Sequence, residues 1–161
     1  IFKRNLQSLC QECHLSQTLF QNVIIIYCFL KYFFIRKEDW LLLDYYVILP
    51  EWRNQGIGGI FLKKFKEFFR DCAGILLEVE RPEMAEDEQE RTIRVHRIRF
   101  YQRNGVQLTG LKVRLFGVPF YIMVMPLLEN PKEALWKEEL DLLYHAMLPG
   151  ALYRENVEWD C

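Results

Sequence analysis

The stretch Leu41–Phe69 reads LLLDYYVILPEWRNQGIGGIFLKKFKEFF and predicts the centre of the fold. An apolar run rich in β-branched and aromatic residues predicts a strand that ends near Leu49. A glycine-rich loop follows, and Ile57–Asp71 is then a predicted helix whose apolar face holds Ile60, Phe61, Phe65 and Phe68 or Phe69. Proteins use this order of strand, glycine-rich turn and helix to hold a phosphate, because the first N–H groups of a helix lack intrahelical partners. We therefore expect an anion site at this loop.

Two common nucleotide-binding loops do not fit these residues. The P-loop requires Gly-Lys-Ser/Thr, whereas Ile60 follows Gly59 here. The dinucleotide pattern G-x-G-x-x-G, started at Gly56, requires a glycine where Phe61 stands. The remaining pattern is R-x-x-G-x-G, formed by Arg53-Asn54-Gln55-Gly56-Ile57-Gly58.

This loop resembles the acetyl-CoA pyrophosphate loop of the GNAT superfamily of N-acetyltransferases, whose pattern is Arg/Gln-x-x-Gly-x-Gly/Ala. A second segment, Arg99–Val106, reads RFYQRNGV and resembles the GNAT segment Leu/Phe-Tyr-x-x-x-Gly-Phe. The resemblance covers Val23–Leu128. The chain departs from the family pattern in the acidic segment Glu83–Glu90, and in Arg94, which stands where an asparagine often contacts the coenzyme.

The resemblance implies that acetyl-CoA is the acetyl donor and that no metal takes part. It implies that Tyr101 acts as the general acid and protonates the CoA thiolate as it leaves. It also implies that a backbone N–H near Ile48 donates to the oxyanion. The residues that the resemblance assigns to the coenzyme are the end of the strand and the loop: Val47, Ile48, Arg53, Asn54, Gln55, Gly56, Ile57, Gly58 and Gly59.

Three carboxylates are candidates for the base that removes a proton from the acceptor. Glu80 is preferred because it lies nearest the carboxyl end of its strand, where this fold opens its substrate cleft. Glu78 and Asp44 are the others, and Glu78 shares one strand face with Glu80 because the two are two residues apart. Alternatively, these carboxylates are surface charges or partners of Arg97 and Arg99. A water chain can also remove the proton without a dedicated base.

Length and composition predict one domain over residues 1–161, of which 131–161 lie outside the strong resemblance. Half the residues are hydrophobic (51%), so a sizeable core is available. The formal net charge of −1 gives no global attraction to nucleic acid or to an anionic membrane. The longest apolar run, Val23–Ile35, is too short to span a bilayer. We expect a cytoplasmic protein with neither nucleic acid nor membrane as a partner.

Five cysteines, at positions 10, 13, 28, 72 and 161, do not form the pattern of a disulfide-stapled domain. Cys10, Cys13 and His14 match the c-type haem attachment pattern, but we prefer the interpretation that these are reduced thiols on a helix that happen to be spaced three residues apart. Two cysteines and one histidine are too few for a closed zinc site. We expect reduced thiols.

The predicted fold class is α/β, a GNAT-like three-layer α-β-α domain with a mixed, mainly antiparallel central sheet. A short charged turn between two β-rich runs predicts an antiparallel hairpin. The C-terminal helix is expected to cover the core, with the cleft border or a homodimer contact as alternatives. The expected helices are 1–21, 57–71, 91–103 and 131–148, and the expected strands are 23–35, 40–49, 75–80 and two within 106–128, with a further strand or packed tail over 153–159.

The resemblance implies an N-acetyltransferase that moves acetyl to a primary amine by direct transfer in a ternary complex. A catalytically silent acyl-CoA-binding sensor or assembly module is the alternative, and an acyl group other than acetyl stays open. We expect a small-molecule acceptor rather than a protein. Carboxylates near the cleft favour a cationic acceptor such as a polyamine, an amino sugar or a lysine-like amine.

Overall fold

The structure is a computed structural model that describes residues 31–37, 39–48, 50–128 and 135–160. The helix predicted over 1–21, and the part of the predicted strand 23–35 that precedes residue 31, lie outside these residues. The elements in chain order are β1 (Lys31–Lys37), β2 (Trp40–Val47), η1 (Pro50–Trp52), α3 (Ile57–Phe68), β3 (Gly74–Glu80), η2 (Pro82–Met84), α4 (Glu88–Arg103), β4 (Gln107–Leu115), β5 (Val118–Pro126), α5 (Trp136–Met147), α6 (Gly150–Asn156) and β6 (Val157–Trp159).

The strands form one six-stranded sheet in the order β1-β2-β3-β5-β4-β6. Only the β2–β3 pair is parallel among the described strands, and the others are antiparallel. The predicted mixed, mainly antiparallel sheet is therefore confirmed. The predicted hairpin is confirmed as well, since β1 and β2 pair antiparallel. The apolar run Phe120–Met125 lies in β5, which is paired on both sides.

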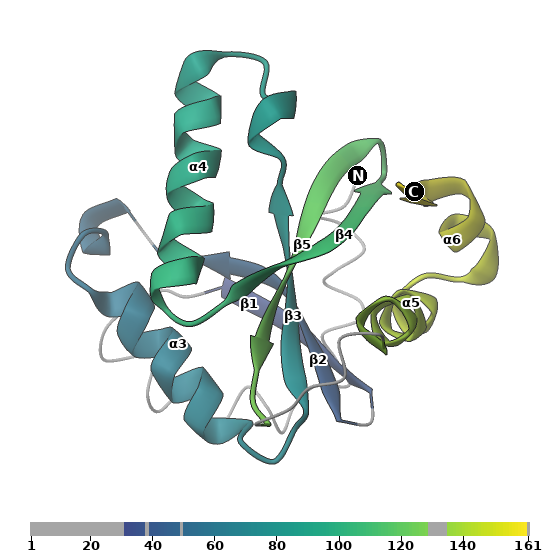
Figure 1. The fold of residues 1–161 in the computed structure, drawn as a ribbon, viewed down its shortest axis with the longest axis horizontal. Coiled ribbons are helices and arrows are strands. Elements are labelled where there is room, and N and C mark those ends of the chain that lie inside the picture. Colours follow the sequence, from purple (N-terminus) through teal and green to yellow (C-terminus); the bar gives the residue numbers. More distant parts are fainter. Residues whose placement is uncertain (1–30, 38, 49, 129–134, 161) are drawn as a thin grey trace.

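Helices lie on both faces of this sheet, so the predicted three-layer arrangement is confirmed. In Figure 1, α3 and α4 lie on one side of the strands and α5 and α6 on the other. Each side has its own buried core, and alternate residues of β2 divide between them. Leu41 and Leu43 pack with Leu62 and Phe65 of α3. Leu42 packs with the α5 side chains Trp136, Leu140, Leu143 and Tyr144.

The buried stripe of α3 differs from the predicted one. Leu62, Phe65 and Phe69 are buried, whereas Ile60 is 61% exposed. The prediction placed Ile60 on the core face. At 3.6 residues per turn, a residue two positions before Leu62 points to the opposite side of the helix, and that side faces solvent here.

The acidic segment Glu83–Glu90 covers the end of η2 and the first turn of α4. Asp87 is the N-cap, and its Oδ1 accepts a hydrogen bond of 2.7 Å from the N–H of Glu90. Because the cap fixes where α4 begins, it also sets which of its side chains face the sheet.

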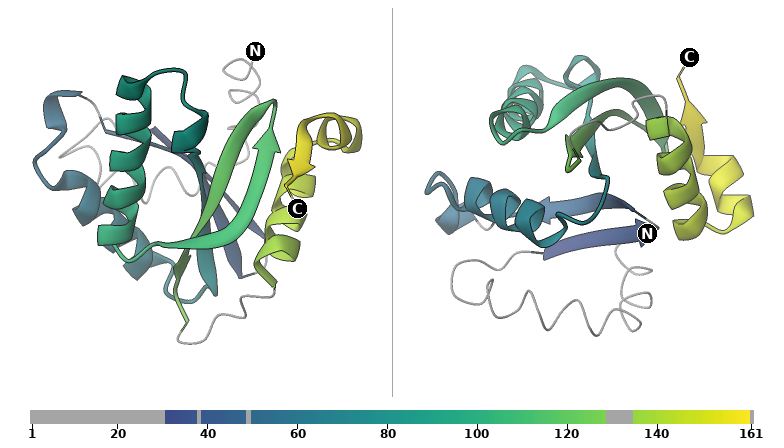
Figure 2. Two further views of the ribbon diagram at one scale, coloured as in Figure 1. Left: turned by 45° about the horizontal axis from the view of Figure 1, so that its top comes forward. Right: turned by 60° about the horizontal axis from the view of Figure 1, so that its bottom comes forward.

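The C-terminal segment forms more structure than the sequence indicates. The segment 153–159 was expected to be a strand or packed tail, but α6 continues to Asn156 and only Val157–Trp159 is a strand, paired with β4. Figure 2 shows the β4–β5 hairpin curving over toward these C-terminal elements. None of the helices in the described ranges is long and apolar enough to cross a membrane.

The parallel strands β2 and β3 separate at their carboxyl ends. Their pairing runs from Trp40 opposite Gly74 to Leu43 opposite Leu77, although both strands continue further. The register of β1 with β2 shifts at the same place, where Phe33 pairs with Tyr45 and Phe34 with Leu43. Asp44 is therefore the extra residue of a β-bulge, a device that ends pairing or re-aims side chains beside functional sites. The two strand ends open the sheet at this position.

Candidate active site

The loop between β2 and α3 turns through two left-handed residues. The N–H of Arg53 bonds to the Pro50 carbonyl at 3.2 Å, and η1 thereby closes the first part of the loop. Asn54 follows with φ 61° and Gly56 with φ 77°. Glycine and asparagine tolerate this region best, so these two residue types suit the turn. Gly56 is then the N-cap of α3.

The first turn of α3 is able to hold an anion. The N–H of Ile60 bonds to the Gly56 carbonyl at 3.2 Å, so the N–H groups of residues 57–59 precede the first intrahelical bond. No side chain caps this end, and the first turn contains no acidic residue. Gly56 is exposed, and no heavy atom lies within 4 Å of where its Cβ would stand. The loop therefore fits a pyrophosphate group, because open N–H groups and the helix dipole both favour negative charge there.

Arg53 holds the loop against the end of β2. Its Nε donates a hydrogen bond of 3.0 Å to the carbonyl of Ile48, the residue after Val47 at the strand end. The arginine of the loop pattern thus ties the loop to the strand whose backbone was predicted to contact the coenzyme. That contact brings Val47, Ile48 and residues 53–59 into one region.

Gly58 is where this loop meets the second predicted motif. A Cβ at Gly58 would lie 2.9 Å from Ile48 Cδ1, from Phe100 Cζ and from Tyr46 Oη. The Tyr46 hydroxyl also donates a hydrogen bond of 3.0 Å to the Gly58 carbonyl. Only a glycine lets α3 begin this close to β2 and α4. The loop and the Phe100–Tyr101 segment, matched separately in the sequence, therefore lie against each other.

Tyr101 follows Phe100 on α4 and is only 7% exposed. Its burial raises the pKa of its hydroxyl to about 12, an effect that the nearby Arg97 charge opposes. The phenol therefore keeps its proton throughout the neutral range, as a proton donor must. Asn104, one helical turn later, lies over Gly59, where a Cβ would stand 2.8 Å from its Oδ1.

Glu80, the preferred base in the sequence, lies among arginines of α4. Its Oε2 accepts a hydrogen bond of 2.7 Å from Arg97 Nη1 and lies 3.8 Å from Arg94 Nε. Arg94 is buried, and it also donates to the Arg81 carbonyl and to Glu90 Oε1, each at 2.8 Å. These contacts correspond to the ion-pair alternative considered for the carboxylates. Arg94 is occupied by protein groups in the place where the family pattern has a coenzyme contact.

Glu78 contacts the opposite layer of the molecule. Its Oε1 accepts a hydrogen bond of 2.6 Å from the Tyr144 hydroxyl of α5. Burial, reinforced by the charge of Asp44, raises the pKa of Glu78 to about 8, while the bond from Tyr144 opposes the shift. Glu78 and Glu80 were predicted to share one face of the strand, but they contact α5 and α4 respectively. Sequence reasoning missed Tyr144, because the contact joins residues 66 positions apart.

A cavity of about 230 Å³ adjoins Glu78 on the α5 side of the sheet. It lies where β2 and β3 separate, and the turn of the β4–β5 hairpin forms its far wall. Its lining residues are Asp44, Glu78, Leu115, Phe116, Val118, Phe120, Tyr144, Met147 and Leu148. This cavity and the loop at Gly56 together make the candidate site.

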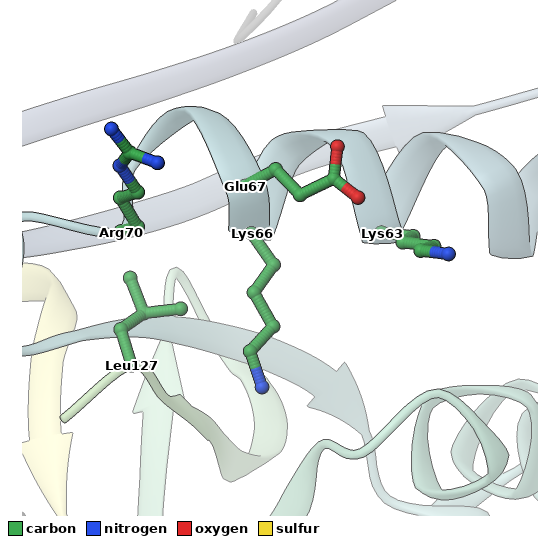
Figure 3. Close-up of a pocket in the computed structure, with 5 residues that line it drawn as sticks. All are labelled: Lys63, Lys66, Glu67, Arg70 and Leu127. Atoms are coloured by element: carbon green, nitrogen blue, oxygen red, sulfur yellow. The ribbon is translucent and has the colours of Figure 1, made fainter. Parts of the chain in front are cut away.

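A second hollow, of about 380 Å³, runs along the later turns of α3 and is lined by Lys63, Lys66, Glu67, Arg70 and Leu127. In Figure 3 the three cationic side chains point in different directions, so they do not converge on one anion. Lys64, on the same helix, forms an ion pair of 2.9 Å with Glu67. This hollow is therefore not part of the candidate site. Among the described residues, no group of three or more His, Cys, Asp or Glu side chains could hold a metal ion.

No family model and no curated protein sequence matches the chain. Its fold, however, matches 26 chains of solved structures. One is assigned to the GNAT family of acetyltransferases and comes from Bacteroides thetaiotaomicron, with 26% identity, a TM-score of 0.54, and coverage of 72% of this chain and 63% of that one. The present chain thus spans less than two thirds of that relative.

Two further matches have TM-scores below 0.5. Nourseothricin acetyltransferase is 22% identical, with coverage of 62% of this chain and 56% of that one and a TM-score of 0.46. An acetyltransferase from Salmonella typhimurium, solved with acetyl-CoA, is 17% identical, with coverage of 63% and 58% and a TM-score of 0.44. The match to the Bacteroides protein carries the comparison, and it confirms the GNAT resemblance and the GNAT-like α/β fold.

Proposed function

We propose that this GNAT-like domain is an N-acetyltransferase that moves acetyl from acetyl-CoA to a primary amine by direct transfer in a ternary complex. One observation carries the proposal. The R-x-x-G-x-G loop and the Phe100–Tyr101 segment meet at Gly58, beside the separated ends of β2 and β3. A coenzyme phosphate at the loop and an acyl group between the strand ends would then both lie near Tyr101.

The coenzyme would be held by the backbone at the end of β2 and by the loop. The open N–H groups of Ile57, Gly58 and Gly59 are the donors for the pyrophosphate, and Gln55 and Gly56 lead into them. Arg53 holds the loop in place through Ile48, and Asn54 supplies its left-handed turn. The backbone of Val47 and Ile48 lies at the strand end, where an N–H can stabilise negative charge on the acyl oxygen. Acetyl-CoA, when bound, supplies the activated acetyl thioester.

Tyr101 would donate a proton to the leaving sulfur. A phenol that keeps its proton at neutral pH is suited to this role, and burial strengthens its hydrogen bonds. Glu80 stays the base predicted from the sequence. To act, its carboxylate would have to release the 2.7 Å bond from Arg97.

Release of free CoA thiol from acetyl-CoA, followed over a panel of primary amines, tests the proposal. We expect thiol release that depends on an amine, and a fall in kcat of about 100-fold or more in Tyr101→Phe, since general acid catalysis contributes on that order. Tyr121→Phe is the matched control, because its hydroxyl donates to the exposed Glu83 outside the site. The control should keep its turnover.

A catalytically silent acyl-CoA-binding module is the second candidate. The engagement of Glu80 with Arg97 and Arg94 favours it, because the predicted base is then occupied. Saturable binding of acetyl-CoA with no thiol release on any amine would establish this alternative and reject the enzyme.

A further inference from the structure

The cavity beside Glu78 lies on the opposite face of the sheet from the coenzyme loop. Leu42 and Leu76 belong to the core beneath α5, and Asp44 and Glu78 each follow two residues later on the same strands. The loop, in contrast, leads into α3 on the other face (Figure 1). Because β2 and β3 stop pairing after Leu43 and Leu77, the two sides can communicate between the strand ends.

The cavity is charged at one end and apolar elsewhere. Asp44 and Glu78 supply two carboxyl groups, and Tyr144 donates to one of them. Among the described residues no side chain forms an ion pair with Asp44, and an ammonium group placed at this end of the cavity would lie beside both carboxyl groups. The remaining walls are aliphatic and aromatic: Leu115, Phe116, Val118, Phe120, Met147 and Leu148. A ligand that matches these walls has one cationic end and an apolar body.

The rim of the cavity shows a backbone outlier that supports a ligand-binding role. Phe116 has φ 50° and Gly117 φ 80°, so the β4–β5 hairpin turns through two left-handed residues. Such turns favour Asn-Gly, and a bulky residue in this region is uncommon. Phe116 is nevertheless present, and it is 38% exposed although it lines the cavity. The Phe116 ring thereby forms part of the apolar wall of the cavity.

We propose that this cavity binds the acceptor, that it selects a compact primary amine carried on an apolar body, and that Glu78 takes the ammonium proton. The inference rests on the proposed function and supplies its acceptor half. At about 30 Å³ for each water-sized group, a cavity of about 230 Å³ holds on the order of eight such groups. That size suits a short alkylamine or an arylalkylamine.

The ammonium gives one proton to the Glu78 carboxylate, and the neutral nitrogen forms a bond to the acyl carbon. The carbon–sulfur bond breaks, and the sulfur takes the proton of the Tyr101 hydroxyl. The amide nitrogen loses its second proton to solvent, from which Tyr101 is reprotonated, and Glu78 later returns its proton to solvent. The products are the N-acetyl amine, the free thiol and one released proton.

The same walls disfavour the cationic acceptors considered from the sequence. A polyamine would place its further charges against the apolar walls of the cavity, and burial of an unpaired charge is strongly unfavourable. An amino sugar would leave its hydroxyl groups, and a lysine-like amine its terminal amide and carboxylate groups, without partners along the apolar wall. These acceptors therefore serve as the contrasting members of a test panel.

The test is steady-state thiol release by the whole chain with acetyl-CoA and five amines. Phenylethylamine and 3-methylbutylamine represent the proposed class, and spermidine, glucosamine and Nα-acetyl-lysine represent the others. We expect kcat/KM to be at least about tenfold higher for the first two, because each well-packed apolar group is worth roughly that factor. Higher kcat/KM on the three polar amines would overturn the inference while leaving the proposed function intact. Absence of thiol release on all five would reject both.

Variants separate the residue roles. Glu78→Gln should lower kcat at least about 100-fold with the KM for acetyl-CoA unchanged. Glu158→Gln is the matched control, since that carboxylate is exposed on β6 and pairs with Arg114. Phe116→Asn should raise the KM for phenylethylamine without lowering the melting temperature, because asparagine suits the turn. If Glu80→Gln abolishes turnover and Glu78→Gln does not, Glu80 is the base and the proposed role of Glu78 falls.

The pH dependence of kcat/KM distinguishes a catalytic role of Glu78 from a structural one, because a structural role would not change it. The groups that face Glu78 are Asp44 on β2 and Tyr144 on α5, and β5 contributes the apolar Phe120. We expect kcat/KM to rise with pH through about 8, where Glu78 ionises in the free protein. Asp44→Asn removes a like charge and should shift this limb to lower pH. If kcat/KM of Glu78→Gln still rises with pH through about 8 as in the wild type, Glu78 is not the base.

Discussion

At the scale of single residues, two positions determine most of the proposed site. Gly58 allows the first turn of α3 to contact β2 and α4 together, and Glu78 places a carboxyl group in the cavity beside α5. The loop pattern alone selected Gly58 as a candidate site residue. The pattern could not identify the partners of Glu78, because Tyr144 reaches it from another layer.

Gly58→Ala should destabilise the fold and weaken acetyl-CoA binding together. The added methyl group would lie 2.9 Å from Ile48, Phe100 and Tyr46, and packed surroundings of this kind cost about 1–3 kcal/mol to overfill. Urea unfolding and calorimetric titration with acetyl-CoA measure the two effects. Gly110→Ala is the control, because no heavy atom lies within 4 Å of its Cβ position. Equal stability of the two variants would contradict the packing described for α3.

The elevated pKa of Glu78 predicts how stability depends on pH. The folded protein holds this proton up to about pH 8, whereas the ordinary value for the carboxyl is 4.5. The stabilising contribution is therefore fully present below pH 4.5 and is lost as pH rises toward 8, by at most about 1.4 kcal/mol for each pH unit.

Glu78→Gln should remove this part of the pH dependence. The free energy of unfolding of the variant, compared with that of the wild type, should therefore be more favourable at pH 8 than at pH 5. Free energies of unfolding from urea titrations at the two pH values measure the difference. If the free energy of unfolding changes between pH 5 and pH 8 by the same amount in the variant as in the wild type, another group is responsible.

At the scale of elements, most of the described helices and strands follow from local sequence. The β-rich runs and the glycine and proline turns identify β1–β5, and the apolar spacing identifies α5. The errors are physical in origin. Ile60 was assigned to the core because helical spacing groups it with Phe61 and Phe65, but the helix face that packs is set by Leu62 and Phe65. Strand β6 covers only Val157–Trp159, because its extent is set by its pairing with β4. Local sequence does not encode that contact.

Asp87 defines the start of α4 and should be a measurable stabilising cap. Asp87→Ala removes the acceptor for the Glu90 N–H and should lower the free energy of unfolding by about 1 kcal/mol. Glu88→Ala is the matched control, since its pair with Arg91 is exposed and should contribute less than about 0.5 kcal/mol. Thermal unfolding of both variants decides between a cap and a general effect of acidic charge.

At the scale of the whole molecule, the sheet brings together motifs that are far apart in the chain. The loop precedes α3, the tyrosine segment ends α4, and Tyr144 comes from α5. Resemblance to a family predicted the three layers and the coenzyme half of the site. The proposed acceptor half was not predictable, because the cavity depends on the separation of β2 from β3, on the bulge at Asp44 and on the curvature of the β4–β5 hairpin.

The central claim is that the loop at the start of α3 holds the coenzyme pyrophosphate. A crystal structure of the protein with acetyl-CoA tests it most directly. We expect the pyrophosphate at the N–H groups of residues 57–59, with the acyl group directed between the ends of β2 and β3. A pyrophosphate bound elsewhere, such as along Lys63, Lys66 and Arg70, would contradict the account.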